Sequence, residues 1–254
     1  MIFRGQTRIM REVDILTKNI IRGYPINIAL IAQSGMGKTT LGLKILGDVG
    51  IHQSQVSGPP DFNFDFGKRH HLFDEVHELK YPEALYEIMD RGDYTMLLAT
   101  NESGDLKEPL LNRCIPLIFE AYTEGDLYNI LGDIIGDELS KELYPTIIDS
   151  CKSNPRELKV LAERLLYVNR EVKLTSVRML KDVMEDILNI YGGLNQNDRI
   201  YLDKLDSLGG MASLTLLENS TGLSKSSLLR LEPELIANGY IKISSRGRVL
   251  VKKY

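Results

Sequence analysis

The chain has 254 residues, of which 43% are hydrophobic and 26% charged, and this composition is typical of a globular protein with two or three structural units. No apolar run approaches the roughly 20 residues that span a bilayer, and the first residues carry no secretory signal, so we expect a cytoplasmic protein without membrane attachment. The two cysteines lack metal-ligand spacing, which predicts reduced thiols. The formal net charge of −4 does not favour nucleic-acid binding, yet residues 242–254 contain five cations and no carboxylate.

Up to about residue 120, short apolar segments alternate with helical patterns. This alternation predicts an α/β domain in which helices cover both faces of a parallel sheet. We expect strands at 26–31, 54–57, 71–74, 95–99 and 115–119. We expect helices at 7–22, 38–48, 79–91 and 105–112.

From residue 123 to about 190 only helical periodicity is found, and this predicts an all-α segment. We expect its helices at 124–136, 137–150, 155–169 and 175–190. The glycine- and asparagine-rich stretch 191–197 predicts a hinge. We therefore predict three domains, at 1–120, 121–192 and 193–254.

The last segment has three short helical patterns and then a β-pair. The helices are expected at 198–208, 213–220 and 224–238, and the strands at 240–244 and 248–252 with a turn at 245–247. Two helices with a short glycine-containing turn and a following hairpin predict a winged helix-turn-helix. Pro233 is expected to bend or shorten the last helix, because proline removes one backbone donor.

The strongest motif is the run AQSGMGKTT at 32–40, between an apolar strand and a helical pattern. Glycines let backbone N–H groups approach phosphate oxygens, a lysine reaches the outer phosphates and a threonine holds Mg²⁺. The motif predicts binding of ATP with Mg²⁺, although Ala32 stands where such a loop usually opens with glycine. We assign nucleotide binding to Gly35, Met36, Gly37, Lys38, Thr39 and Thr40.

Two further strands end in polar residues. The expected strand at 71–74 ends in Asp74, which is expected to orient Mg²⁺ together with Thr39. Glu75 follows it and is expected to polarise the attacking water. A positioned base contributes roughly 10²- to 10⁴-fold in rate. The expected strand at 95–99 is followed by the polar pair Thr100-Asn101. Asn101 is expected to touch the outer phosphate or that water, or else is an ordinary residue at a turn.

Two arginines follow at places where spacing alone leaves a surface charge as the alternative. Arg113 comes at the end of a short helix, from which it can reach a neighbouring subunit's nucleotide. Such an arginine is worth roughly 10³- to 10⁵-fold in turnover. Arg156 follows Pro155 at the first turn of a helix, where it can reach back to the phosphates.

Together these motifs resemble the AAA+ ATPases and, within them, the RuvB-type Holliday-junction branch-migration motors. The resemblance is nearly full length and keeps the order of the motifs. It rests on Phe3-Arg4-Gly5-Gln6, Val56-Ser57-Gly58-Pro59, Asp74-Glu75-Val76-His77, Pro109-Leu110 with Arg113, Tyr122-Thr123, Asn154-Pro155-Arg156 and Ser245-Arg246-Gly247-Arg248-Val249.

The resemblance implies an ATPase with a helical lid and a winged DNA-binding domain. It implies that Tyr122 contacts the nucleotide, that Arg156 is a lid arginine sensing the phosphates, and that Arg113 acts across a subunit interface. A homo-oligomer, on family grounds a hexameric ring, follows from that last role. The catalytic set is then Lys38, Asp74, Glu75, Asn101, Arg113 and Arg156.

The winged domain is expected to contact duplex or branched DNA. Lys242, Arg246 and Arg248 lie on or beside the hairpin turn, where they can neutralise phosphates irrespective of sequence. The alternative is a winged helix that mediates protein contacts. The family's first DNA-contacting arginine falls on Ile243, so only the Arg248 contact carries over directly.

Other departures bear on the function. The segment 60–71 is short, Asn101 stands where the family has threonine, and residues 89–96 lack the long β-hairpin with which the family docks on its junction-recognising partner. The expected function is ATP-driven translocation of DNA and branch migration in recombination and repair. The alternative is an ATP-switched loader or assembly factor for a DNA machine, with a protein adaptor of unknown identity. A transcriptional or transposition regulator is a third possibility.

Overall fold

We describe the protein from a computed structural model. The described residues are 3–50, 54–57 (backbone only), 67, 69–79, 81–101, 107–151, 153–190 and 194–252. Parts of several features named above lie outside them. These are the Ser-Gly-Pro motif at 57–59, the short segment after it, residue 80 of the expected helix 79–91, the first two residues of the expected helix 105–112, the start of the hinge at 191–193, and the last two residues of the cationic segment 242–254.

The chain divides into two compact units. Unit 1 comprises Met1–Ile134 and Ser153–Val160, and unit 2 comprises Ile135–Lys152 and Leu161–Tyr254. In the described part of both units, no helix has the length and apolar character needed to cross a membrane.

Unit 1 is built on a five-stranded parallel sheet with the order β2-β3-β4-β1-β5. The strands are β1 (Ile28–Ile31), β2 (Ser54–Ser57), β3 (His70–Phe73), β4 (Thr95–Thr100) and β5 (Ile115–Ile118). All residues of β1 and β4 are buried, as expected for central strands covered on both faces. Because the strands run in parallel, the polar residues that follow β1, β3 and β4 meet at one edge of the sheet.

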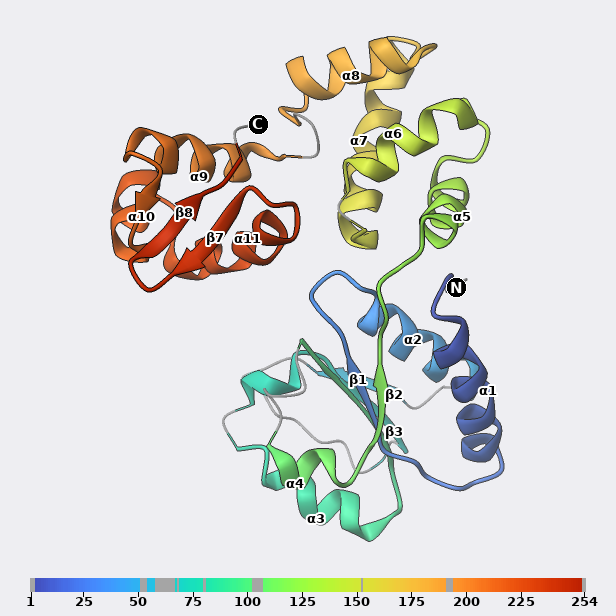
Figure 1. Ribbon diagram of the computed structural model, residues 1–254. Helices are drawn as coiled ribbons and strands as arrows, with labels where there is room; N and C mark the ends of the chain where they lie inside the picture. Colours follow the sequence, from blue (N-terminus) through green and yellow to red (C-terminus); the bar gives the residue numbers. More distant parts are fainter. Residues whose placement is uncertain are drawn as a thin grey trace. The chain divides into compact units, whose positions relative to one another are not determined.

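Helices cover both faces of this sheet (Figure 1). On one face, α1 (Thr7–Ile21) and α2 (Lys38–Asp48) share a core with alternate strand residues, among them Leu30, Leu72 and Leu97. On the other face, α3 (Ala84–Arg91) and α4 (Glu108–Leu111) pack with Ala29, Phe73 and Leu98. Between β3 and α3 lies the short 3₁₀ helix η1 (Val76–Glu78).

The next segment is all helical. Its elements are α5 (Glu124–Ile135), η3 (Lys141–Leu143), α6 (Tyr144–Asp149), α7 (Pro155–Glu171) and α8 (Val177–Asp186). Within unit 2, Asn169 is buried and donates to the Glu138 carbonyl while its amide oxygen accepts from the Leu174 N–H. The buried Asn169 side chain therefore holds together two loops of this helical segment by hydrogen bonds to their backbone.

The C-terminal part has the winged-helix arrangement. It comprises α9 (Gln196–Ser207), β6 (Met211–Ala212), α10 (Leu214–Thr221), α11 (Lys225–Ala237), β7 (Ile241–Ser244) and β8 (Gly247–Leu250). Its antiparallel sheet has the order β6-β8-β7. Gly247 has φ +130°, and a Cβ there would lie 2.4 Å from the Ala212 carbonyl oxygen, so β6 and β8 approach closely because this residue is glycine.

Most expected elements are confirmed, and the exceptions have local causes. The expected helix 79–91 is shorter than predicted, because α3 begins only at Ala84, while η1 lies before the expected range. In the expected helix 137–150 the structure has η3 and α6. Gly136 ends α5 with φ +58°, Ser140 caps η3 and Pro145 sits in the first turn of α6, so a continuous helix is excluded.

Two further differences concern the winged helix. The two-residue strand β6 is too short for an alternating pattern and was not expected. The prediction that Pro233 shortens the last helix is wrong, because α11 continues to Ala237. The helix carries buried Leu228 and Leu235 on either side of the proline, and this packing outweighs the loss of one backbone hydrogen bond.

Candidate functional site

The candidate site is a cavity of about 520 Å³ in unit 1, at the start of α2. Described residues from the phosphate loop, the segment before α1, the end of β3, α5 and the start of α7 line it. The lining residues are Phe3, Arg4, Gly35, Gly37, Lys38, Thr39, Thr40, Glu75, Tyr122, Ile130, Asp133, Ile134, Pro155, Arg156 and Lys159.

The phosphate loop has the backbone that anion binding requires. The Ala32 N–H donates to the Thr100 carbonyl, so the loop begins as a continuation of the sheet despite the missing glycine. Gly35 and Gly37 have φ +86° and +92°, which side chains disfavour. Helix α2 then begins at Lys38, so its first N–H groups and the positive end of its dipole are at the cavity.

Lys38 is only 5% exposed and is held by three acceptors. Its Nζ donates to the carbonyl oxygens of Ala32 and Gln33 at 2.9 and 3.3 Å and to Oδ1 of Asn101 at 2.9 Å. Burial lowers the pKa of Lys38 from its ordinary value, partly offset by the carboxylates of Glu75 and Asp74. An outer phosphate would provide the charge partner that this ammonium group otherwise has only at a distance.

Thr39 and Asp74 form the candidate magnesium pair. The Thr39 hydroxyl donates to Oδ2 of Asp74 at 2.7 Å. Mg²⁺ is usually bound by one or two protein oxygens, several waters and phosphate oxygens, so this donor set fits it. The described residues contain no group of three or more His, Cys, Asp or Glu side chains placed to hold a metal ion.

Glu75 and Asn101 are linked directly. The Asn101 amide donates to Oε2 of Glu75 at 3.0 Å, and this oxygen also lies 3.5 Å from Nδ1 of His77. Glu75 has φ +50°, which is unusual for a residue with a side chain and which turns the chain sharply after β3. Asn101 therefore connects Lys38 with the carboxylate expected to act on water.

Tyr122 reaches the phosphate loop from the segment after β5. Its hydroxyl donates to the Met36 carbonyl at 2.9 Å, and burial raises its pKa to about 12. A Cβ on Gly5 would lie 2.7 Å from the Tyr122 ring, so the chain before α1 passes close to this tyrosine because Gly5 has no side chain.

Arg156 also reaches the phosphate loop. Its Nη1 donates to the Ser34 hydroxyl at 3.2 Å. The neighbouring Asn154 donates from Nδ2 to the Ser34 carbonyl at 3.1 Å, and its Oδ1 accepts from the N–H groups of Arg156 and Glu157 at the start of α7.

Arg113 does not line the cavity. Nε and Nη2 contact the Asp90 carboxylate at 2.7 and 2.9 Å, Nη1 donates to the Pro109 carbonyl, and the guanidinium lies 4.9 Å from the centre of the Tyr86 ring. The hydrogen bonds to Asp90 raise the pKa of Arg113. Of the expected catalytic residues, the structure therefore brings five together and leaves Arg113 elsewhere in unit 1.

Several cavity residues were not found by motif reasoning. Arg4 forms a two-point ion pair with Asp133, with contacts of 2.7 and 2.9 Å between residues far apart in the sequence. Asp133, Ile130 and Ile134 lie on α5 and Lys159 on α7, and no local pattern marks them. Asn154 lies in a recognised motif, but its contact with Ser34 carries no sequence signal.

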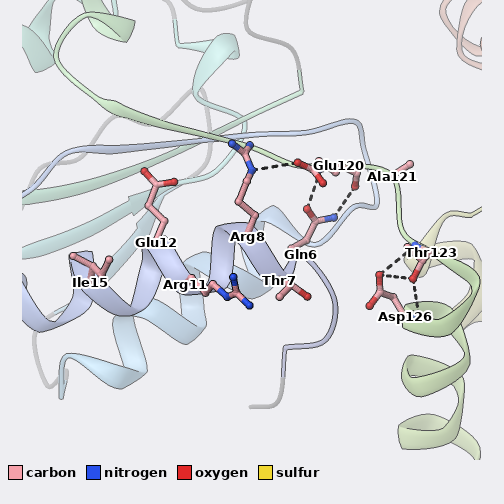
Figure 2. A pocket seen from close by; sticks show the side chains of 10 residues that line it. All are labelled: Gln6, Thr7, Arg8, Arg11, Glu12, Ile15, Glu120, Ala121, Thr123 and Asp126. Carbon is pink, nitrogen blue, oxygen red and sulfur yellow. Dashed lines mark hydrogen bonds and ion pairs between the residues drawn. The ribbon is translucent and has the colours of Figure 1, made fainter.

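Unit 1 contains a second cavity, of about 590 Å³, over the start of α1. Figure 2 shows Gln6 bonded to the backbone of Glu120 and Arg8 reaching the side chain of the same residue. Carboxylates and guanidinium groups both line this cavity, so its chemistry favours neither an anion nor a cation. The two hydrogen bonds between Gln6 and the Glu120 backbone hold the segment before α1 to the segment after β5.

The three expected DNA-binding cations of the winged helix differ in their surroundings. Lys242 and Arg246 are exposed on β7 and its turn. Arg248 is bound to Glu232 by Nε and Nη2 at 2.7 and 3.0 Å, with side-chain exposures of 16% and 4% for the pair. The buried Tyr201 hydroxyl donates to the same carboxylate at 3.0 Å.

The fold and site together define a class: the chain has the AAA+ fold, a parallel sheet with helices on both faces followed by a helical lid and a winged-helix domain. The family model of the RuvB C-terminal winged helix domain matches residues 191–253. Within its class the chain is RuvB-like over nearly its whole length.

Two relatives are named Holliday junction branch migration complex subunit RuvB. The one from Fervidobacterium nodosum is 26% identical over 298 residues, covering 98% of this chain and 84% of that protein. The one from Thermosipho melanesiensis is 27% identical over 296 residues, covering 98% and 93%. The solved structure of the Thermotoga maritima RuvB Holliday junction branch migration motor has 25% identity and a TM-score of 0.83, covering 98% of this chain and 93% of that one.

One departure from the family pattern is visible in the fold. Helix α3 ends at Arg91 and β4 begins at Thr95, so residues 92–94 are the whole connection. The expected absence of a hairpin at this place is confirmed within the described range 81–101.

Proposed function

We propose that the protein is an ATP-dependent DNA motor that moves branched DNA, the activity for which its relatives are named. The observation that carries the proposal is the chain of contacts from Lys38 through Asn101 to Glu75, beside the Thr39–Asp74 pair. This chain of contacts supports the proposal because it joins a lysine and a carboxylate that both line the cavity through one amide.

Each site residue then has a defined part in ATP hydrolysis. Loop N–H groups and Lys38 bind the phosphates, and Thr39 and Asp74 would hold Mg²⁺, which would supply charge neutralisation for the phosphate oxygens. Glu75 orients the attacking water and accepts its proton, while Asn101 keeps the carboxylate directed toward the outer phosphate. Tyr122 and Arg156 contact the bound nucleotide from the side of the cavity that the phosphate loop forms.

Arg113 completes the site of a neighbouring subunit. Arg113 is not among the residues that line the cavity of its own chain, and this supports an action in trans, where an arginine stabilises charge in the transition state. A homo-oligomer is therefore part of the proposal, and a hexameric ring is its form on family grounds. Asp90 and Tyr86 hold the guanidinium in place before the neighbour arrives.

DNA contact is assigned to the wing. Exposed Lys242 and Arg246 suit phosphate binding that is independent of sequence. Arg248 is engaged with Glu232, so we propose that it shapes the wing and that its neighbours make the contact.

A second candidate function is an ATP-switched loader or adaptor. The three-residue connection between α3 and β4 favours it, because the family's docking hairpin belongs at that place. Such a protein would bind ATP and DNA but would not move a junction, and it would depend on a protein partner attached elsewhere.

A synthetic four-way junction distinguishes the two functions. The purified chain should separate the junction into two duplexes with ATP and Mg²⁺ but not with ADP, and Glu75→Gln should abolish movement while ATP still binds. ATP-dependent junction binding without movement would favour the loader. Absence of ATP binding by the unmodified chain would refute both.

A further inference from the structure

We propose that Asn154 is a positioning residue that fastens the start of α7 to the phosphate loop and so sets where Arg156 meets the outer phosphate. This inference rests on the proposed function, since it assigns how the lid arginine of that same site is aimed. It adds a residue to which none of the motif roles above applies.

The evidence begins with the contacts of one side chain. Nδ2 of Asn154 donates to the Ser34 carbonyl at 3.1 Å, while Oδ1 accepts from the Arg156 N–H at 3.0 Å and from the Glu157 N–H at 3.4 Å. The amide therefore caps α7 with its oxygen and holds the loop with its nitrogen. Arg156 itself contacts the Ser34 hydroxyl at 3.2 Å, so both residues converge on the same loop residue.

The loop is shaped to receive this amide. A Cβ on Gly35 would lie 2.4 Å from Oδ1 and 2.8 Å from Nδ2 of Asn154. The amide thus occupies the space that any side chain at Gly35 would need. Gly35 is required here for close approach as well as for its φ of +86°.

The backbone before the helix is also held in an unusual state. Ser153 has φ +58°, which costs a residue with a side chain free energy unless its surroundings compensate. This turn directs the following asparagine at the loop, and the bond to the Ser34 carbonyl is a compensating contact.

Only one residue type of this size does both tasks. Aspartate and serine are good helix caps, because each offers an oxygen to the first N–H groups. Neither can replace the amide donor: aspartate presents a carboxylate to the Ser34 carbonyl, and the serine side chain is shorter. Asn154→Asp and Asn154→Ser therefore separate capping from the loop contact.

The consequence concerns discrimination between nucleotides. Arg156 follows Asn154 by two residues, so a helix start that is no longer bonded to the Ser34 carbonyl leaves the guanidinium free to adopt several positions. ATP has the outer phosphate that Arg156 contacts in the proposed site, and ADP lacks it. Loss of the contact between Asn154 and the Ser34 carbonyl should therefore weaken ATP binding more than ADP binding.

The test measures dissociation constants for a fluorescent non-hydrolysable ATP analogue and for fluorescent ADP, with Mg²⁺, on the full chain. We expect both Asn154 variants to bind the ATP analogue about tenfold more weakly, the size of one well-placed hydrogen bond, with ADP affinity changed less than about twofold. Asn19→Asp is the matched control: the Asn19 amide also donates to a backbone carbonyl, that of Ile15 in α1, and its loss should change neither constant by more than about twofold.

A second measurement needs no variant. Hydrogen exchange at the amides of Arg156 and Glu157 in the unmodified chain should be slowed more by the ATP analogue than by ADP. Equal loss of both affinities in the variants, or wild-type affinities, or equal protection by the two nucleotides would overturn the inference. If the unmodified chain binds neither nucleotide, the proposed function fails instead.

Discussion

Replacing Arg248 with methionine should destabilise the winged helix strongly. The substitution keeps most of the side chain's length but removes both hydrogen bonds to Glu232, whose side chain is 4% exposed. Among the contacts of the described residues, the carboxylate then keeps the one from the Tyr201 hydroxyl. Breaking a buried ion pair on one side typically costs about 3–5 kcal/mol, and the 16% exposure of Arg248 places our expectation near 3 kcal/mol.

Hydrogen exchange with mass spectrometry is the suitable assay, because it reports the stability of one part of a chain that unfolds in several steps. Peptides from α11 and β8 should exchange about a hundredfold faster, the factor that corresponds to roughly 3 kcal/mol. The double variant Arg248→Met with Glu232→Leu should recover most of the loss, since a buried pair can be replaced by apolar residues at little cost.

Arg246→Met is the control for charge. Arg246 is exposed beside the same hairpin, so its loss should change exchange by less than threefold while weakening DNA binding and reducing its salt dependence. If Arg248→Met leaves exchange unchanged and the double variant loses DNA affinity as Arg246→Met does, then Arg248 is a DNA contact and our reasoning on the ion pair is refuted.

Three further predictions follow from unit 1. Lys38→Ala should reduce ATP affinity below detection in a fluorescence titration, because the buried ammonium is the main cation of the phosphate loop; unchanged affinity would remove the loop assignment. Mixing Arg113→Ala subunits with Glu75→Gln subunits should partly restore ATP turnover, since mixed interfaces then include intact sites; no rescue after verified mixing would contradict an action in trans. Burial raises the pKa of Cys114 to about 12, so its thiol stays neutral at pH 8. Iodoacetamide should therefore modify Cys114 about a thousandfold more slowly in the folded chain than after denaturation, and the rate should rise only as the pH approaches 12. Rapid labelling of the native chain, measured by mass spectrometry, would show the thiol to be accessible.

What could be predicted from the sequence depended on how local each feature is. The phosphate loop is a contiguous motif, and its expected position between a strand and a helix is confirmed, since α2 begins at Lys38 directly after Gly37. Its role in binding nucleotide stays a prediction. Asp74, Glu75 and Asn101 follow neighbouring strands, and a parallel sheet brings such strand ends together. Their direct contacts confirm that geometry, while their catalytic roles stay predictions.

Contacts between distant segments could not be predicted. The pairing of Arg4 with Asp133 joins residues separated by 129 positions. Arg4 lies in a recognised motif, but no pattern marks Asp133 or the contact between them. The same holds for Arg248, which charge counting placed on the DNA surface. Its partner Glu232 looks like an ordinary helix carboxylate in sequence, but in α11 it is buried and faces the guanidinium.

The short connection between α3 and β4 is a suitable place to insert a segment by protein engineering. A Cβ added at Gly92 would meet nothing within 4 Å, and Asp93 is exposed, so the crossing is a surface position of the kind that accepts inserted chain. A hairpin transplanted from a relative at this place would show whether recruitment of a junction-binding protein is a separable module. The unmodified chain would then be the control that lacks the hairpin.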